Sequence, residues 1–174
     1  MQAAIRHGGD LGRARASFPL APEPWIDLST GINPHSYPHS PVPASAFARL
    51  PEPSALNHLK EVAAAAFGAP SAAHIVAAPG TQMLMPLLAE LALQRGAKSA
   101  AVLTPAYAEH ARTARMAGLD VAEVSTFSEL SDFDYAVVIN PNNPDGRVMT
   151  RDEFMVLAAK MSRKGGLLVI DEAF

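Results

Sequence analysis

Polar and aromatic residues follow four apolar runs of this sequence, at positions where a bound molecule could be held. Asp171 closes the run "LLVI", and Asn143 lies in "NPNNPDG", directly after "YAVVI". Tyr107 follows "AAVLT", and a turn at 80–82 follows "HIVAAP". Free N–H groups at a helix start favour an anion, and Gly80 lets the backbone come close to it. A tyrosine ring can stack on a flat ligand, and a carboxylate that closes a buried strand can hold a cationic group.

Each of these groups has a structural alternative when it is considered alone. The 80–82 segment could be an ordinary turn, and Tyr107 could pack under a loop. Asn140 or Asn143 could hydrogen-bond the backbone of its own turn, and Asp171 could cap a helix or form a structural ion pair. The functional interpretation requires that these groups meet at one edge of one sheet.

The elements that would position these residues are predicted by apolar strands that alternate with helical patterns. Strands are expected at 74–80, 99–105, 120–125, 134–141 and 166–174, and helices at 54–68, 81–96, 106–118 and 150–165. This alternation predicts an α/β fold with a mostly parallel sheet and helices on both faces. In such sheets ligands bind beyond the carboxyl ends of the strands.

Residues at the helix ends support these boundaries. Ser54 and Thr150 are expected as N-caps, because their hydroxyls can accept from free backbone N–H groups. Gly68, Gly96 and Gly118 mark the ends of three helices, where a left-handed backbone conformation is common.

The segment 18–53 differs in composition from the rest of the chain. "FPLAPEPW" and "INPHSYPHSPVP" are so rich in proline that neither a long helix nor a central strand is expected there. We expect a Pro-rich arm over residues 1–53, with short helices at 10–17 and 44–50. The α/β part would then cover residues 54–174.

The composition disfavours several classes of function. A net charge of −3 and a pI near 6.0 do not indicate a nucleic acid or an anionic membrane as partner. Cysteine is absent, which excludes disulfides and cysteine nucleophiles. Prolines around His35 and His39 prevent the helix that would align them, so we expect no metal site. Without an apolar leader or a run long enough to span a bilayer, a cytoplasmic location is expected.

Taken together, the strand-end groups match the chemistry of one ligand. An anion cradle, a stacking ring, a neutral amide and a carboxylate would suit a phosphate, a planar ring, a ring oxygen and a basic ring nitrogen. Pyridoxal 5'-phosphate carries all four groups. Neither G-x-G-x-x-G nor G-x-x-x-x-G-K-[ST] is present, which disfavours a nucleotide-binding domain.

The same motifs resemble those of the fold-type-I pyridoxal-phosphate aminotransferase superfamily. "NPNNPDG" is similar to N-P-N-N-P-T-G, and "VIDEAF" is similar to V-x-D-E-A-Y. "PGTQ" and "PAYAEH" match in order and spacing. The opening "RHGGDLGRARASF", followed by "WIDLSTGINP", resembles the H-G-G-N…L-D-x-S-x-x-I-N-P of the threonine-phosphate decarboxylases of cobalamin biosynthesis. Those enzymes are relatives of histidinol-phosphate aminotransferases, and the resemblance covers the whole chain.

The resemblance implies a role for each matching residue of the cofactor site. Asp171 would hold the pyridine nitrogen protonated, which makes the ring an electron sink for catalysis. Tyr107 would stack on the pyridine ring, and Asn143 would bond the ring oxygen. Thr81 and Gln82 would supply backbone amides to the cofactor phosphate.

The resemblance also implies residues that contact a phosphorylated amino-acid substrate. His7 and Gly8 would contact it from the N-terminal arm, and Gly31 would contact it through its backbone. Asn143 would lie close to both substrate and cofactor, and Asn33 is a weaker candidate.

Three departures from the family pattern affect these expectations. Phe174 stands where the wider family usually has Tyr, which the cobalamin-type relatives tolerate. "LPEPSALNHLK" lacks the Tyr that in many relatives reaches across the dimer. The Schiff-base lysine lies beyond the "DEAF" motif in the family, and Lys60, Lys98, Lys160 and Lys164 match no such motif. We therefore expect an N-terminal portion of the enzyme, inactive alone and a homodimer when full length.

On this interpretation residues 1–53 contribute to the small domain and the substrate site, and residues 54–174 form the first part of the large cofactor-binding domain. The implied activity is decarboxylation of L-threonine O-3-phosphate to (R)-1-amino-2-propanol phosphate. One alternative is a histidinol-phosphate-type aminotransferase. An alternative of another class is a non-catalytic binding module without the Schiff-base lysine.

Overall fold

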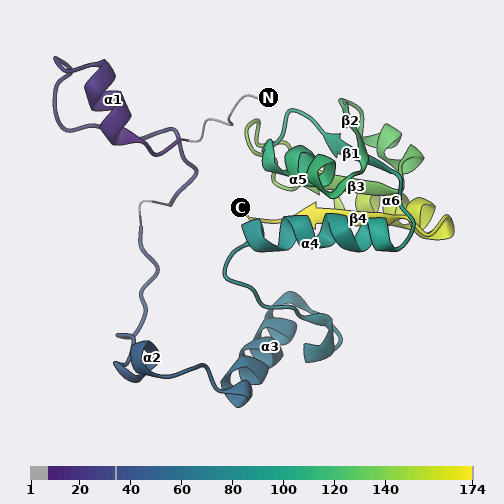
Figure 1. The fold of residues 1–174 in the computed structure, drawn as a ribbon, viewed down its shortest axis with the longest axis horizontal. Coiled ribbons are helices and arrows are strands. Elements are labelled where there is room, and N and C mark those ends of the chain that lie inside the picture. Colours follow the sequence, from purple (N-terminus) through teal and green to yellow (C-terminus); the bar gives the residue numbers. More distant parts are fainter. Residues whose placement is uncertain (1–7, 34, 174) are drawn as a thin grey trace. The chain divides into compact units, whose positions relative to one another are not determined.

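The computed structural model of the chain describes residues 8–33 and 35–173. The chain forms two compact units, Met1–Ala55 and Leu56–Phe174 (Figure 1). The functional assignment of an arm, 1–53, and the first part of a large domain, 54–174, stays a prediction.

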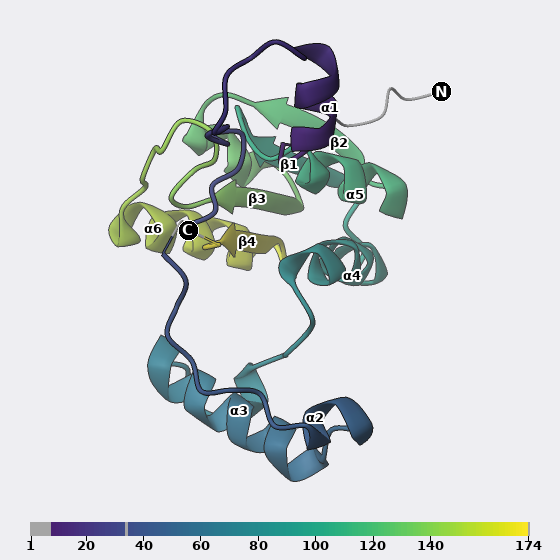
Figure 2. The same cartoon turned by 90° about the vertical axis from the view of Figure 1, so that its left-hand side faces the viewer.

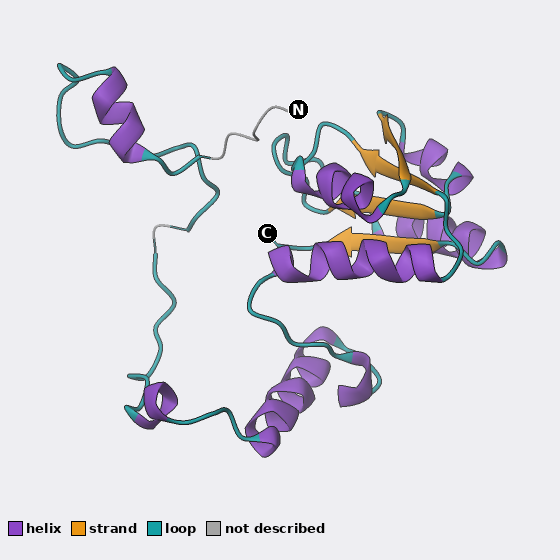
Figure 3. Cartoon of the chain, in the orientation of Figure 1, coloured by secondary structure: helices purple, strands orange, loops and turns teal. Residues whose placement is uncertain are grey.

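The first unit consists mainly of loops, with two short helices (Figure 3). Helix α1 spans Leu11–Ser17, and the side chain of Asp10 accepts a hydrogen bond from the Arg13 amide at 2.9 Å to cap it. Helix α2 spans only Ser45–Ala48. Both short helices were predicted, and the described residues of the proline-rich stretches between them form neither helix nor strand.

The second unit contains the strands and the longer helices. Helix α3, Pro53–Phe67, begins in the last residues of the first unit and continues into the second. The elements that follow in chain order are η1 Ala72–His74, α4 Thr81–Gln94, β1 Ser99–Leu103, α5 Glu109–Ala117, β2 Asp120–Val124, η2 Phe127–Asp132, β3 Tyr135–Ile139, α6 Arg151–Arg163 and β4 Leu167–Asp171. Within the described residues, no helix has both the length and the apolar character that a membrane span requires.

The four strands form one parallel sheet in the order β2-β1-β3-β4. The predicted α/β fold with a mostly parallel sheet is therefore confirmed. Strand β3 lies inside the sheet and is buried over its whole length, which its unbroken apolar run "YAVVI" requires. Because all four strands run in one direction, their carboxyl ends lie at the same edge.

Helices cover both faces of the sheet (Figure 2). Val102 and Val137 point to the face that packs against alanines of α4 and α5. Their neighbours Leu103 and Val138 point to the opposite face, where α6 packs with Phe154, Leu157 and Met161. The alternation of adjacent strand residues between two cores is the two-residue period of a strand buried on both sides.

Most of the predicted helix ends are confirmed. The Thr150 side chain and the Glu153 side chain cap each other's backbone N–H groups at the start of α6. Gly118 ends α5 in the left-handed conformation, with φ of +99°. Ser54, predicted as an N-cap, lies instead inside α3, because the helix already begins at Pro53. Proline is favoured at a first helical position, where its missing N–H costs nothing.

The strand predicted at 74–80 is wrong. The residues form the end of the short 3₁₀ helix η1 and then an irregular segment, in which Val76 is 77% exposed. Its composition suits a strand, but a strand needs a neighbour to satisfy its backbone groups. In the described part of the chain, no strand pairs with this segment.

The amino-terminal edge of the sheet is fixed by Asp134. Its carboxylate accepts hydrogen bonds from the Lys98 amide at 2.9 Å and from the Ser99 amide and hydroxyl at 3.1 and 3.0 Å. Its carbonyl accepts from the Leu167 amide at 2.8 Å. One residue thus connects the starts of β1, β3 and β4. The hydrogen bonds to its carboxylate hold the pKa of Asp134 below its ordinary value, and the bond from the Lys98 amide makes the largest contribution.

Replacing Asp134 with alanine is expected to lower the free energy of unfolding by about 1–2 kcal/mol, since two strand-start amides lose their acceptor. Urea denaturation at neutral pH measures this loss, and Asp132→Ala, which removes the same charge from an exposed position, is the control. Because the folded-state pKa of Asp134 is lowered, its contribution is present above the unfolded pKa of about 3.9 and is lost as the pH falls through the folded value. Equal effects of the two variants at neutral pH would contradict this role.

Candidate functional site

The carboxyl ends of β1, β3 and β4 lie together at one edge of the sheet. The Asn140 amide, just beyond β3, donates to the Asp171 carbonyl at the end of β4 over 2.8 Å. Asp171 and Ile139 are register partners of these two strands. The strands therefore deliver the residues that follow them to a common region, as the parallel topology predicts.

Asp171 is paired with a histidine that the sequence analysis did not single out. Its Oδ2 lies 2.8 Å from Nε2 of His110, which α5 contributes. The side chains of His110 and Asp171 are only 4% and 11% exposed. The hydrogen bond from His110 is the main reason that the pKa of Asp171 is lowered, although burial acts against it. A nearly buried carboxylate is thus kept ionised at the end of an apolar strand.

Tyr107 lies next to this pair. Its ring packs edge-to-face against the ring of His110, with 6.4 Å between the centroids. Partial burial, together with the charge of Glu109, raises the pKa of the Tyr107 hydroxyl. The tyrosine, the histidine and Asp171 therefore form a continuous group that joins the loop after β1 to the end of β4.

The start of α4 contributes to the same place. Gly80, with φ of +99°, precedes the helix, and space for a Cβ around it is open. Thr81 lines a cavity of about 250 Å³ together with His110 and Asp171. Its apolar walls come from α4 and β4, through Leu84, Met85, Leu88, Val169 and Ile170. The free backbone N–H groups of a helix start and an ionised carboxylate thus share one cavity.

The buried carboxylate of Glu109, paired with the half-exposed Arg112, orients the second residue of α4. The Gln82 side chain donates to Oε2 of Glu109 at 3.2 Å, and Arg112 donates to the same oxygen at 3.0 Å. Glu109 is only 4% exposed, so its charge requires such partners. The first turn of α4 is therefore connected to the first turn of α5.

The loop after β3 separates three asparagines with different surroundings. Asn140 Oδ1 accepts from the Met149 amide at 2.8 Å, so its side chain bonds backbone beyond its own turn, just before α6. Asn142 is buried, whereas Asn143 is exposed at the tip of the loop. An exposed Asn143 has its amide available for a ligand, and its proposed bond to a ring oxygen stays a prediction.

Apart from Asn143, the substrate candidates belong to the first unit. His7 lies outside the described residues. Gly8 lies against Ser29, whose carbonyl a Cβ at this position would strike, and the Gly9 amide donates to Ser29 Oγ at 2.8 Å. The opening glycines therefore contact the "DLSTG" segment that also contains Gly31, and Gly31 is exposed. Their contact with substrate stays a prediction.

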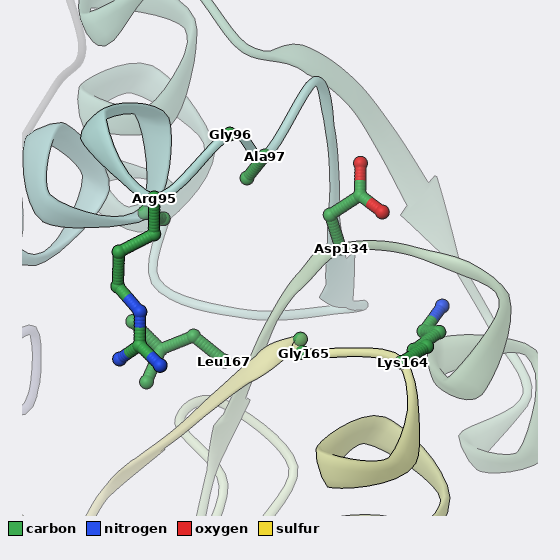
Figure 4. Close-up of a pocket in the computed structure, with 9 residues that line it drawn as sticks. Arg95, Gly96, Ala97, Asp134, Lys164, Gly165 and Leu167 are labelled. Atoms are coloured by element: carbon green, nitrogen blue, oxygen red, sulfur yellow. The ribbon is translucent and has the colours of Figure 1, made fainter.

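Two of the four lysines lie at the opposite edge of the sheet from Asp171. Lys98 precedes β1, and Lys164 follows α6. Figure 4 shows Lys164 with Arg95 and Asp134 around a small pocket formed by the turns that end α4 and α6. Lys160 lines a separate groove between η2 and α6. The described residues contain no cluster of three or more potential metal-ligating side chains.

Comparison with known proteins identifies the family. The sequence profile described as Aminotransferase class I and II matches residues 23–174. The chain belongs to this family. A threonine-phosphate decarboxylase of Sinorhizobium sp is 38% identical over 175 residues, which cover 100% of this chain and 52% of that protein. The corresponding protein of Pseudomonas aeruginosa is 35% identical over 98% of this chain and 50% of its own length.

A more distant relative carries another name. Histidinol-phosphate aminotransferase 3 of Mesorhizobium japonicum is 28% identical over 90% of this chain and 45% of its own length. This aminotransferase-family chain thus spans about half the length of the curated relatives that it matches. The resemblance inferred from the motifs is confirmed at the level of sequence.

Solved structures confirm the fold. The L-threonine-O-3-phosphate decarboxylase of Porphyromonas gingivalis superposes with a TM-score of 0.56 at 24% identity, over 68% of this chain and 36% of that chain. The aspartate aminotransferase of Thermus thermophilus gives a TM-score of 0.57 at 24% identity, with the same shares of the two chains. The α/β fold predicted as aminotransferase-like is therefore correct.

The structure identifies residues that the sequence analysis missed. His110 lies three residues after Tyr107, and this spacing places two side chains on one side of a helical turn. That spacing was the available signal for His110. Glu109 and Asn142 gave no comparable signal, because their burial depends on contacts with distant parts of the chain.

Replacing His110 with alanine is expected to raise the pKa of Asp171 above its ordinary value. The variant removes the main stabilisation of the carboxylate and leaves its burial, which favours the neutral form. Carbon-13 NMR titration of the aspartate carboxyl groups measures this change, with His35→Ala as a control at an exposed position. An unchanged titration of Asp171 in the His110 variant would show that the pair does not set its charge.

Proposed function

We propose that the full-length protein that contains residues 1–174 is a pyridoxal-phosphate-dependent lyase. It decarboxylates L-threonine O-3-phosphate to (R)-1-amino-2-propanol phosphate, a step of cobalamin biosynthesis. The hydrogen bond of 2.8 Å between His110 and Asp171 at the carboxyl edge of the sheet, which lowers the pKa of Asp171, is the observation that carries this proposal. Two threonine-phosphate decarboxylases that are 38% and 35% identical over almost the whole chain support it.

The groups at this edge fit the cofactor in their chemistry. Asp171 is an ionised acceptor that can pair with a protonated pyridine nitrogen, and His110 keeps this acceptor charged and fixed in direction. Thr81 and Gln82 begin a helix of 14 residues, whose free N–H groups suit a dianionic phosphate. When bound, pyridoxal phosphate supplies an electron sink for the carbanion that remains after carbon dioxide leaves.

The remaining residues orient the cofactor and the substrate. Tyr107 stacks on the cofactor ring, and its edge contact with His110 limits the positions of the tyrosine ring. Asn143 donates its exposed amide to the ring oxygen. His7, Gly8 and Gly31 are the residues proposed to contact the phosphorylated substrate. Gly8 lies so close to Ser29 that its position has no space for a larger residue.

A second candidate activity is an aminotransferase that acts on histidinol phosphate. The relative from Mesorhizobium japonicum, 28% identical over 90% of this chain, favours it. Both activities would use the same strand-end groups. We further propose a cytoplasmic homodimer that binds neither nucleic acid nor membrane, in line with the pI near 6.0.

The products of the reaction distinguish these candidates. The full-length protein is incubated with pyridoxal phosphate and L-threonine O-3-phosphate. It is expected to release one carbon dioxide for each (R)-1-amino-2-propanol phosphate formed. Formation of glutamate from histidinol phosphate and 2-oxoglutarate, without carbon dioxide, would instead establish the aminotransferase. Cofactor binding without either reaction would favour the non-catalytic binding module.

Substitution of Asp171 by asparagine is expected to leave cofactor binding nearly intact and to lower kcat by about a hundredfold or more, since a neutral amide cannot hold the pyridine nitrogen protonated. Steady-state kinetics and a cofactor-binding titration measure the two quantities separately. Asp132→Asn removes an equal charge from an exposed position of the same unit and should change neither. Unchanged turnover in the Asp171 variant would contradict the role assigned to this carboxylate.

A further inference from the structure

Asn142 is a buried amide to which the proposed function gives no role. It is 5% exposed, whereas its neighbour Asn143 is exposed. Its Nδ2 donates to the Pro105 carbonyl at 2.7 Å and to Oδ1 of Asp145 at 2.7 Å. Because both partners are acceptors, the orientation of the amide is defined, and both of its hydrogens are used.

The hydrogen bonds around Asn142 close the loop into a ring. The backbone N–H of Asn142 donates to the Arg147 carbonyl at 2.8 Å. The backbone N–H of Gly146 donates to the backbone carbonyl of Asn142, also at 2.8 Å. The Arg147 amide donates to Oδ1 of Asp145 at 3.0 Å. The Arg147 amide and then the Asn142 side chain hold the pKa of Asp145 below its ordinary value. Residue 143 therefore lies at the tip of a loop with a fixed base.

The bond to Pro105 connects this ring to a different part of the site. Pro105 lies two residues before Tyr107, in the loop that follows β1. The side-chain amide of Asn142 thus connects the loop after β3 to the loop after β1. It joins the segment that carries the ring-stacking candidate to the segment that carries the candidate for the ring oxygen.

The two polar atoms of the Asn142 side-chain amide differ in their hydrogen bonding. The Oδ1 atom of Asn142 is buried and has no hydrogen-bond partner among the described residues. An unpaired buried carbonyl oxygen is destabilising, and native proteins contain few of them. The two bonds that Nδ2 makes to separate segments explain why the side chain is an amide.

We propose that Asn142 is a positioning residue that sets the separation of Tyr107 and Asn143. We call the bonds of the Asn142 side chain to the Pro105 carbonyl and to Asp145 the latch. When the latch is formed, the ring of Tyr107 and the amide of Asn143 are held in place before the cofactor binds, so that less ordering is needed on binding. Asp145 is the second half of the latch, because it accepts from Asn142 and from the loop backbone with one oxygen. This inference rests on the proposed function, since the two positioned groups are its cofactor contacts.

The test compares variants of the latch residues in the full-length protein. Asn142→Ala is expected to weaken pyridoxal-phosphate binding about tenfold, and Asp145→Ala by a similar factor, which is the scale of one lost hydrogen bond. Asp145→Asn keeps an acceptor oxygen in place and should restore affinity to within about twofold. Asn57→Ala, on the exposed face of α3, is the matched control.

Hydrogen exchange of the 174-residue chain without cofactor separates failure of the latch from failure of the proposed function. In Asn142→Ala, amides of 106–109 and of 140–148 should both exchange faster, while those of β1 and β3 stay protected. Faster exchange confined to 140–148, or an affinity loss no greater than that of Asn57→Ala, would overturn the positioning role. If the unaltered gene product binds no pyridoxal phosphate, the proposed function fails and the cofactor part of this inference fails with it. The exchange of 106–109 then still decides whether the latch exists.

Discussion

A hydrogen bond of 2.8 Å between Asp171 and His110 joins the last strand of the sheet to helix α5. A carboxylate at the end of a strand as apolar as "LLVI" would be costly without such a partner, and its pKa would rise with burial. The pairing instead lowers the pKa, and the charge remains at the edge where parallel strands present their carboxyl ends. The cavity lined by Thr81, His110 and Asp171 therefore contains a nearly buried, paired carboxylate, and Glu172 adds a second carboxylate to its lining.

The two edges of the sheet differ in how their polar groups are used. At the amino edge, Asp134 satisfies the amides that begin β1 and accepts from that of β4, so its polar atoms serve the scaffold. At the carboxyl edge, Tyr107 and the exposed Asn143 lie on loops that the Asn142 bond to Pro105 connects. A rigid sheet with one edge used for structure leaves the other edge for binding, which is the usual arrangement of ligand sites in parallel α/β proteins.

The sequence predicted those features that depend on local patterns. Strands β1, β3 and β4 followed from apolar runs, and the α6 cap followed from Thr150 and its position before a helical pattern. The strand expected at 74–80 did not form, because pairing depends on a neighbour that local composition does not reveal. His110, Glu109 and Asn142 escaped prediction for a related reason, since each acquires its role from contacts across 27 to 61 residues of sequence. The family motifs identified the residues expected to touch ligand, and the structure added those that hold them.

The role proposed for Asp171, oriented by His110, is to keep the pyridine nitrogen of the bound cofactor protonated. Nitrogen-15 NMR of the full-length protein, loaded with pyridoxal phosphate labelled at the ring nitrogen, measures this protonation directly. If Asp171 has this role, the ring nitrogen should show the chemical shift of a pyridinium ion at neutral pH, and the shift of a neutral pyridine when Asp171 is replaced by asparagine. The shift of a neutral pyridine in the unaltered protein would contradict it.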